Sequence, residues 1–295
     1  MGFEHLELIT LQQYWWIIIS LLGGFFVFIM FVQGGQTLID KLSENEIEKT
    51  MLINSIGRKW ELGFTTLVLF GGALFAAFPL FYATSFGGAY WVWLSILFCF
   101  IIQAVSYEFR TKPNNFLGQK TYELFLKING NIGTFLLGVA ISTFFSGSEF
   151  IVDSNNFVDW KNSLRGLEAL LNPYNYLLGF ALVFLAKISG ALYFINNINH
   201  EKIKTKAINS IKINMIFFLF LFLGFMFWIL TKDGFAINNE GFVYIKEYKY
   251  FYNLLEMPIV LAIFLIGVLM VIIAVFITIT FKKQIVDRKK NGFKL

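Results

Sequence analysis

Residues 60–110 read WELGFTTLVLFGGALFAAFPLFYATSFGGAYWVWLSILFCFIIQAVSYEFR, and this stretch decides the fold. Two apolar runs, 62–84 and 89–107, flank a short turn at 85–88 that holds no Lys, Arg, Asp or Glu. Each run is close to the ~20 helical residues that cross a hydrocarbon core of ~30 Å. We therefore expect a tight hairpin of two membrane helices. Glu61 opens this hairpin, and Glu108 closes it on the same side of the bilayer.

The rest of the chain repeats this pattern. Its 295 residues are 57% hydrophobic and only 15% charged, whereas about a quarter of the residues in a soluble domain are charged. Backbone groups find no water partner in hydrocarbon, so long apolar runs are expected to be helices. The sequence predicts an all-α polytopic protein, one integral membrane domain over residues 1–295. Its seven spans are 14–39, 62–84, 89–107, 128–145, 174–195, 213–230 and 257–281.

The positions of Lys and Arg predict the orientation of the spans. Eighteen of the 24 basic residues lie in segments 40–61, 108–127, 196–212 and 282–294, which share one side of the membrane. Five lie on the other side, and Lys187 lies within a span. Because basic residues favour the cytoplasmic side, we expect a cytoplasmic C-terminal tail and an outside N-terminus. The same bias accounts for the net charge of +5, so no nucleic-acid partner is expected.

A set of short motifs spread over some fifty residues carries a family resemblance. These are NSIG at 54–57, Trp60 followed by an acid, GGALFA at 71–76, Pro79, Tyr82 and EFR at 108–110. As a set they resemble subunit II of the cytochrome bd family of membrane quinol oxidases. The resemblance implies two four-helix bundles, with 1–147 as a complete first bundle and 148–173 as an outer loop. Residues 174–295 would form a second, incomplete bundle, because family members usually have further spans after the equivalent of Phe281.

The resemblance also implies a function and partners. The chain would be the non-haem subunit of a quinol:oxygen oxidoreductase in the bacterial cytoplasmic (inner) membrane. A haem-bearing subunit I would carry haems b and d, bind quinol and reduce oxygen to water. This chain would scaffold that subunit, contact membrane lipids and help to bring in cytoplasmic protons. A small single-span accessory subunit and a structural quinone are compatible with the resemblance, although no motif locates either.

The chain itself is expected to bind no haem or metal and to perform no redox step. Haem ligation most often needs a histidine within the spans, but His5 and His200 both lie outside the apolar runs. The alternative function is a small-solute or ion transporter, which Lys187 and the glycine-rich first span could suit. Against it, no inverted repeat with paired broken helices is recognisable.

Trp60, Glu61 and Glu108 are the candidates for a proton pathway. A carboxylate at the start of a span can line a proton route, or it can merely complement the helix dipole. The resemblance favours the proton role, because the family usually has Trp followed by Asp at the cytoplasmic entrance of a proposed proton pathway. Glu108 either forms a helix-end ion pair with Arg110 or feeds protons beside Glu61.

Four residues are candidates for packing or for the subunit interface: Lys187, Gln33, Gln36 and Arg110. A charge midway along a span is costly, so Lys187 should face protein or water, with a carboxylate of the other subunit as its partner. Gln33-Gly34-Gly35-Gln36 allows close helix packing. Many family members have acids at this point, and their proton role cannot pass to amides, which do not titrate. This replacement is compatible with the cyanide-insensitive branch of the family.

Overall fold

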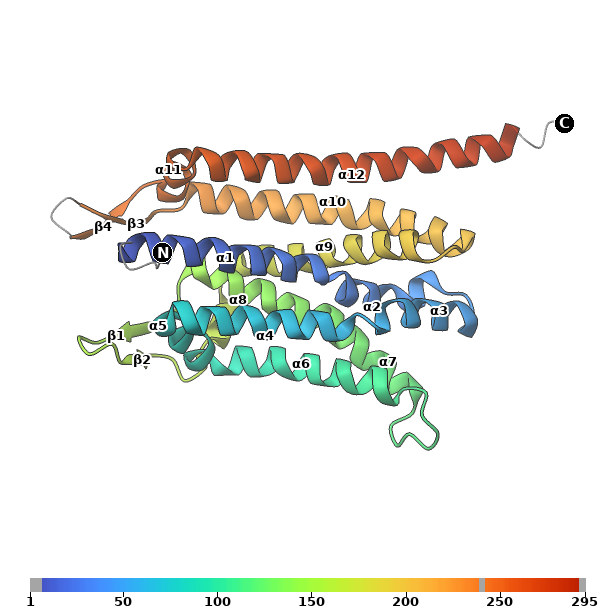
Figure 1. The fold of residues 1–295 in the computed structure, drawn as a ribbon, viewed down its shortest axis with the longest axis horizontal. Coiled ribbons are helices and arrows are strands. Elements are labelled where there is room, and N and C mark those ends of the chain that lie inside the picture. The colour runs from blue at the N-terminus through green and yellow to red at the C-terminus, as the bar shows by residue number, and fades with distance from the viewer. Residues whose placement is uncertain (1–6, 239–241, 292–295) are drawn as a thin grey trace, which may run out of the picture.

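The structure is a computed structural model that describes residues 7–238 and 242–291. It is a bundle of long helices lying nearly side by side (Figure 1). In chain order the helices are α1 (Leu8–Ile29), α2 (Phe31–Leu42), α3 (Glu46–Gly57), α4 (Trp60–Ala77), α5 (Pro79–Tyr82), α6 (Tyr90–Phe109), α7 (Gln119–Ile128), α8 (Thr134–Ser146), α9 (Pro173–Asn197), α10 (Glu201–Thr231), α11 (Lys249–Glu256) and α12 (Pro258–Asn291).

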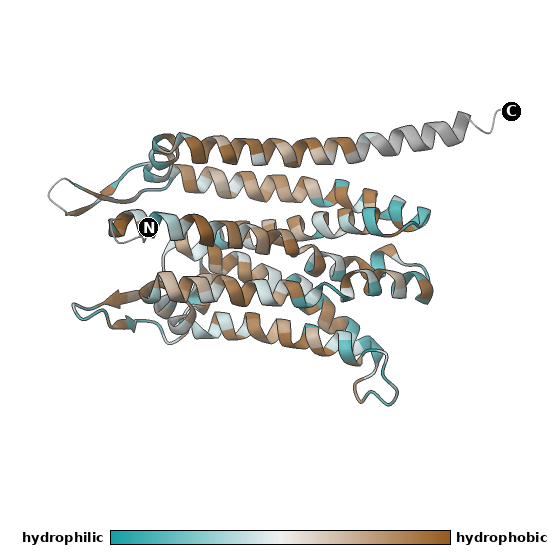
Figure 2. Ribbon diagram, in the orientation of Figure 1, coloured by the Kyte–Doolittle hydropathy of each residue, from teal (hydrophilic) through white to brown (hydrophobic). Residues whose placement is uncertain are grey.

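The predicted all-α membrane class is confirmed. In the described part of the chain, six helical segments are long and apolar enough to span a membrane, and each overlaps one of the first six predicted runs. The seventh, α12, follows α11 after a bend of 99° and counts as a span if this bent pair is one. Figure 2 shows apolar residues along the middle of the helices and polar residues gathered at their ends, as expected for helices in lipid.

The connection within the predicted hairpin is longer than the sequence indicates. α4 already ends at Ala77, and Pro79 occupies the first position of the short helix α5. Proline has no backbone N–H, which is tolerated only in the first turn of a helix. A π-helical stretch, Ala83–Gly88, then leads into α6. The predicted direction is nevertheless correct, because α4 begins and α6 ends at the same end of the bundle (Figure 1).

Helix α2 packs directly on α9 through small residues. A Cβ atom added to Gly34 would overlap the backbone carbonyl of Ala186, and one added to Gly190 would overlap the backbone of Gly35. This confirms the packing interpretation for the two glycines of the first span. α9 also supplies buried residues to both apolar core clusters, for example Ala191 to one and Leu182 to the other. The division into bundles 1–147 and 174–295 stays a prediction.

Two pairs of short strands lie at the end of the bundle where α8 stops. In the predicted outer loop, β1 (Phe150–Val152) pairs antiparallel with β2 (Val158–Trp160), and a 3₁₀ turn follows at Leu167–Leu171. A second antiparallel pair, β3 (Gly234–Ile237) and β4 (Val243–Lys246), lies between α10 and α11. The predicted cytoplasmic C-terminal tail is described only as backbone up to Asn291, and residues 292–295 lie outside the described residues.

Candidate functional site

A polar pocket of about 590 Å³ lies where α4 begins and α6 ends. We call it the Trp60 pocket. The Trp60 ring stacks on Tyr107, with ring centres 6.4 Å apart and planes 10° from parallel. Gly57 makes room for this pair, because a Cβ atom there would come within 3.3 Å of the Tyr107 ring. The pocket is lined by Ile53, Asn54, Ser55, Gly57, Arg58, Lys59, Trp60, Tyr107, Glu108, Arg110, Thr111, Tyr193 and Asn197.

The structure brings two of the three proton-pathway candidates together in this pocket. Trp60 and Glu108 both line it. Glu61 lies in the first turn of α4 at the same end of the bundle, but it is exposed and does not line the pocket. Tyr107 was not predicted as a site residue. Its position one residue before Glu108 gave no signal by itself, because an aromatic residue near a span end is ordinary.

Arg110 pairs with Glu123, not with Glu108. The Arg110 side chain is only 5% exposed, and its Nη2 and Nε atoms donate to Oε1 of Glu123 at 2.7 and 3.0 Å. The helix-end pair between Arg110 and Glu108 is therefore wrong. Residues two apart on a helix point to different sides, so Glu108 turns toward the Trp60 pocket while Arg110 turns toward α7. Glu108 stays exposed as a carboxylate of the pocket.

Glu123 is the centre of an ion-pair network that the sequence analysis missed. Lys49 on α3 lies 3.0 Å from Glu123, 3.3 Å from Asp40 and 3.6 Å from Glu46. Asp40 also pairs with Lys127. The network therefore joins α2, α3, α7 and the end of α6. It fixes the C-terminal end of α6, which carries Tyr107 and Glu108, relative to α3.

Gln36 on α2 links the interior of the bundle to Tyr107, which lines the Trp60 pocket. Its Nε2 donates a hydrogen bond of 3.0 Å to the Tyr107 hydroxyl. Gln33, one turn earlier on α2, is buried as well. Lys187 on α9 is half-buried, and its Nζ lies 5.4 Å from the centre of the Phe184 ring. Among residues 7–238 and 242–291 the structure gives Lys187 no salt bridge.

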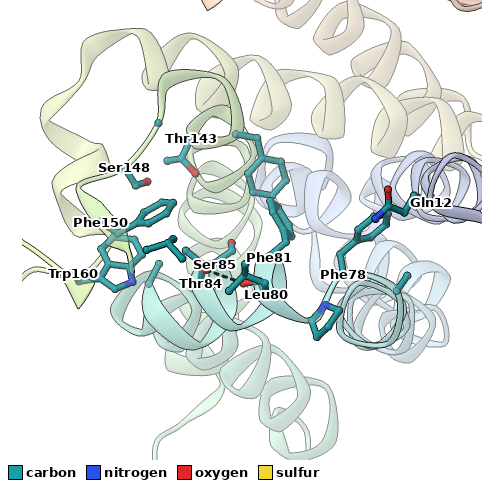
Figure 3. Close-up of a pocket in the computed structure, with 16 residues that line it drawn as sticks. Gln12, Phe78, Leu80, Phe81, Thr84, Ser85, Thr143, Ser148, Phe150 and Trp160 are labelled. Carbon is teal, nitrogen blue, oxygen red and sulfur yellow. Dashed lines mark hydrogen bonds between the residues drawn. The ribbon is translucent and has the colours of Figure 1, made fainter. Parts of the chain in front are cut away.

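A second pocket, of about 640 Å³, lies at the opposite end of the bundle (Figure 3). We call it the Phe78 pocket. Phe78, Phe81 and Phe150 supply apolar walls, and Thr84, Ser85 and Thr143 supply hydroxyl groups. No charged side chain is among its lining residues. Its chemistry suits the apolar body of a neutral ligand more than an ion.

Within the described residues, the one histidine, His200, lies at a helix end outside the spans. His200 precedes α10, where its Nδ1 accepts a hydrogen bond of 3.4 Å from the Ile203 N–H, and its Nε2 lies 3.6 Å from Glu48. It therefore serves as a helix cap. His5 lies outside the described residues. In the described part of the chain, no three His, Cys, Asp or Glu side chains are grouped to hold a metal ion.

Comparison with known proteins decides the family. Residues 11–290 match the family described as cytochrome bd terminal oxidase subunit II. The chain belongs to this family. It is 28% identical to a probable cytochrome oxidase subunit 2 of Haemophilus influenzae, over 84% of this chain and 68% of the relative. It is 27% identical to cytochrome bd-I ubiquinol oxidase subunit 2 of Escherichia coli, over 78% of this chain and 60% of the relative.

A third relative covers a shorter part of the chain. Cytochrome bd ubiquinol oxidase subunit 2 of Bacillus subtilis is 33% identical over 50% of this chain and 44% of the relative. Against the Escherichia coli and Bacillus subtilis proteins, the chain thus spans less than two thirds of the relative's length. The family resemblance inferred from the motifs at 54–110 is confirmed. The alternative of a small-solute or ion transporter receives no support.

Proposed function

We propose that this multi-pass membrane protein is the non-haem subunit of a quinol oxidase complex and that the Trp60 pocket admits cytoplasmic protons. One observation carries the proposal: in a chain of the cytochrome bd subunit II family, the exposed Glu108 carboxylate lines a polar pocket beside the stacked Trp60 and Tyr107 rings. A solvated carboxylate at a membrane surface can line a proton route into the protein.

Five side chains would act in this uptake. Glu61 lies in the first turn of α4 and Glu108 near the end of α6, and these two helix ends lie at the same end of the bundle (Figure 1). Two carboxylates there concentrate protons near the surface. Trp60 and Tyr107 form a rigid wall on one side of the pocket. The Tyr107 hydroxyl accepts from Gln36 and can itself donate a proton. A polar connection therefore runs from the pocket into the first span.

The redox chemistry would belong to a partner. Haems b and d would be held by a haem-bearing subunit I, since the described spans of this chain offer no imidazole. Lys187 would meet a carboxylate of that subunit, because its side chain is half-buried and has no salt bridge among the described residues. A small single-span accessory subunit could complete the complex. The Phe78 pocket is the place whose lining best suits a structural quinone or a lipid chain.

The proposal requires the Trp60 pocket to face the cytoplasm, with the N-terminus outside. A membrane-impermeant amine reagent added to intact spheroplasts should then label Lys161, which lies on the side of the Phe78 pocket, and not Lys204. The opposite labelling pattern would overturn the orientation and the proton-uptake role together.

The decisive functional test is quinol-driven oxygen consumption of the complex purified with its partner. We expect Glu108→Gln and Glu61→Gln each to slow turnover by about threefold to tenfold, equivalent to ~0.7–1.4 kcal/mol in the barrier, with haem content preserved. The matched control is Glu149→Gln. Glu149 is an exposed carboxylate just before β1, at the end of the bundle opposite the Trp60 pocket. Unchanged turnover in both variants, or equal slowing in the control, would leave the pocket without a role in proton uptake.

A further inference from the structure

Four amide side chains in the first half of the chain are buried without full hydrogen bonding. We call them the amide cluster: Gln33, Gln36, Gln103 and Asn129, each no more than 1% exposed. Five of their polar atoms have no hydrogen-bond partner among the residues that the structure describes, and these atoms are Gln33 Nε2, Gln36 Oε1, Gln103 Nε2, Gln103 Oε1 and Asn129 Oδ1. Native proteins rarely bury such atoms unsatisfied. Five in one cluster therefore need an explanation.

Two hydrogen bonds place Gln103 between the other members. On α6, Cys99, Gln103 and Tyr107 are spaced four residues apart and share one face of the helix. At one end of this face, Asn129 Nδ2 donates to the Cys99 carbonyl at 3.1 Å. At the other end, Gln36 Nε2 donates to the Tyr107 hydroxyl at 3.0 Å. Gln103 thus lies one helical turn from Cys99, which accepts from Asn129, and one turn from Tyr107, which accepts from Gln36.

Gln33 closes the cluster from the side of α2 and α4. Its backbone carbonyl lies so close to Gly130 that a Cβ atom there would overlap it, which brings α2 next to Asn129. Its Nε2 lies 3.7 Å from the position that a Cβ atom of Gly63 on α4 would take. Asn129 begins a π-helical stretch, Asn129–Gly133, and such widened turns recur at functional sites. Four helical segments therefore surround the cluster.

The unpaired atoms are chemically complementary, yet none of them bonds to another. The two Nε2 atoms are donors and the three oxygens are acceptors. A ligand between them must both donate and accept hydrogen bonds, and it must be neutral, because no member of the cluster is charged. It must also be small, because the helices are in close contact around it. Water meets all three conditions, and buried water typically makes two to four such bonds.

We propose that the amide cluster binds ordered water inside the bundle, next to the inner end of the Trp60 pocket. Bridging waters would pair the unpaired atoms of Gln33, Gln36, Gln103 and Asn129, while Gln36 Nε2 stays bonded to the Tyr107 hydroxyl. The site needs no carboxylate, so it explains how amides can occupy positions 33 and 36 at the centre of a membrane protein. Gln36 is shared with the polar connection proposed above, but water binding in the cluster does not require Glu61 or Glu108 to carry protons.

Cys99 is a built-in reporter for this water. Its thiol is buried, with 4% of the residue exposed. Cys99 Sγ and Asn129 Nδ2 lie 3.8 and 3.5 Å from one shared point, the Cβ position of Gly133. Brief X-ray exposure converts bound water to hydroxyl radicals in place, and these oxidise the nearest sulfur. Bulk radicals do not reach a thiol that is buried in this way.

The test is radiolytic labelling of the complex purified with its partner, read by mass spectrometry of the Cys99 peptide. We expect oxidation of Cys99 in the unmodified protein and at least a fivefold lower rate in Gln103→Leu, whose apolar side chain displaces water. The control is Ser142→Ala, because Ser142 is buried but already bonded to Asn175 at 2.8 Å, and it should leave the rate unchanged. Absence of Cys99 oxidation in the unmodified protein, or equal rates in Gln103→Leu, would overturn the proposal.

A second measurement keeps the test valid if Gln103→Leu fails to assemble. A cryo-electron microscopy map of the unmodified complex should show solvent peaks at hydrogen-bonding distance from both Gln103 amide atoms. Direct amide-to-amide contacts with no solvent peak between them would overturn the proposal. Neither readout uses oxygen consumption, so failure here and failure of the proposed proton uptake are told apart.

Discussion

Replacing Glu123 with Gln tests whether the ion pair with Arg110 stabilises the fold. Both side chains are nearly buried, with 5% of Arg110 and 11% of Glu123 exposed. Removing one partner of a buried pair costs ~3–5 kcal/mol, mostly because the other charge is left uncompensated. Here Arg110 keeps Glu46 at 3.9 Å, and Lys49 keeps Asp40 at 3.3 Å. These remaining partners partly compensate each charge, so we expect a loss at or just below the lower limit of that range, about 2–3 kcal/mol in the free energy of unfolding.

The assay is reversible unfolding in mixed detergent micelles, for Glu123→Gln, Arg110→Met and the double variant. A double-mutant cycle isolates the energy that the two side chains share. We expect a coupling energy of about 2 kcal/mol. In Arg110→Met the buried positive charge is absent, so the further loss of Glu123 leaves no uncompensated charge at that position. The control is Asp159→Asn, which breaks an exposed pair with Lys161 and should cost no more than ~0.5 kcal/mol.

Two results would refute this reasoning. Additive effects of Glu123→Gln and Arg110→Met would mean that the two side chains do not stabilise each other. A loss of stability in Glu108→Gln that equals the loss in Glu123→Gln would mean that Arg110 uses Glu108 as its partner. On the geometry described, Glu108→Gln should leave the free energy of unfolding within ~0.5 kcal/mol of the unmodified protein, as for other exposed substitutions.

Two further predictions concern the packing of α2 and the loop that follows it. Gly34→Ala should destabilise the fold by ~3 kcal/mol or more, because the added Cβ atom would overlap the Ala186 carbonyl. The control is Gly24→Ala, which has open space around the added Cβ atom and should be tolerated. Thermal unfolding of both variants measures the difference. Hydrogen bonds from Lys202 lower the pKa of Glu44, so stability that Glu44 contributes is full above pH ~4.5 and is lost as pH falls through its lowered value. Unfolding measured from pH 7 to 3 should therefore show Glu44→Gln less stable at neutral pH, with the difference shrinking as the pH falls below ~4.5.

The spans could be predicted from the sequence because lipid leaves the backbone few alternatives. A run such as 62–84 must bond its own N–H and C=O groups, so apolar length alone predicts a helix. The corner after α4 was predicted less well. Pro79 lies inside the apolar run, and hydropathy does not register that its missing N–H ends α4 at Ala77. Sequence length and composition thus predict spans better than they predict where each helix breaks.

The partners of charged side chains could not be predicted in the same way. Glu108 and Arg110 are close in sequence, and this proximity favoured a local pair. Glu123 lies on the next helix, and it reaches Arg110 only because the chain after α6 turns back and α7 packs against α6. Ion pairs of this kind depend on tertiary geometry, which no spacing rule along one helix contains.

The sequence indicates part of the amide cluster. Gln33 and Gln36 were recognised as unusual because they flank two glycines, but Gln103 lies in an equally apolar run and Asn129 begins the next one. A polar amide within a membrane span is costly unless it finds a partner, so each of the four predicts a contact. What the sequence lacks is the register that brings them together. That register follows from the close contact of Gly130 with the Gln33 carbonyl, and it makes four separate anomalies into one site for water.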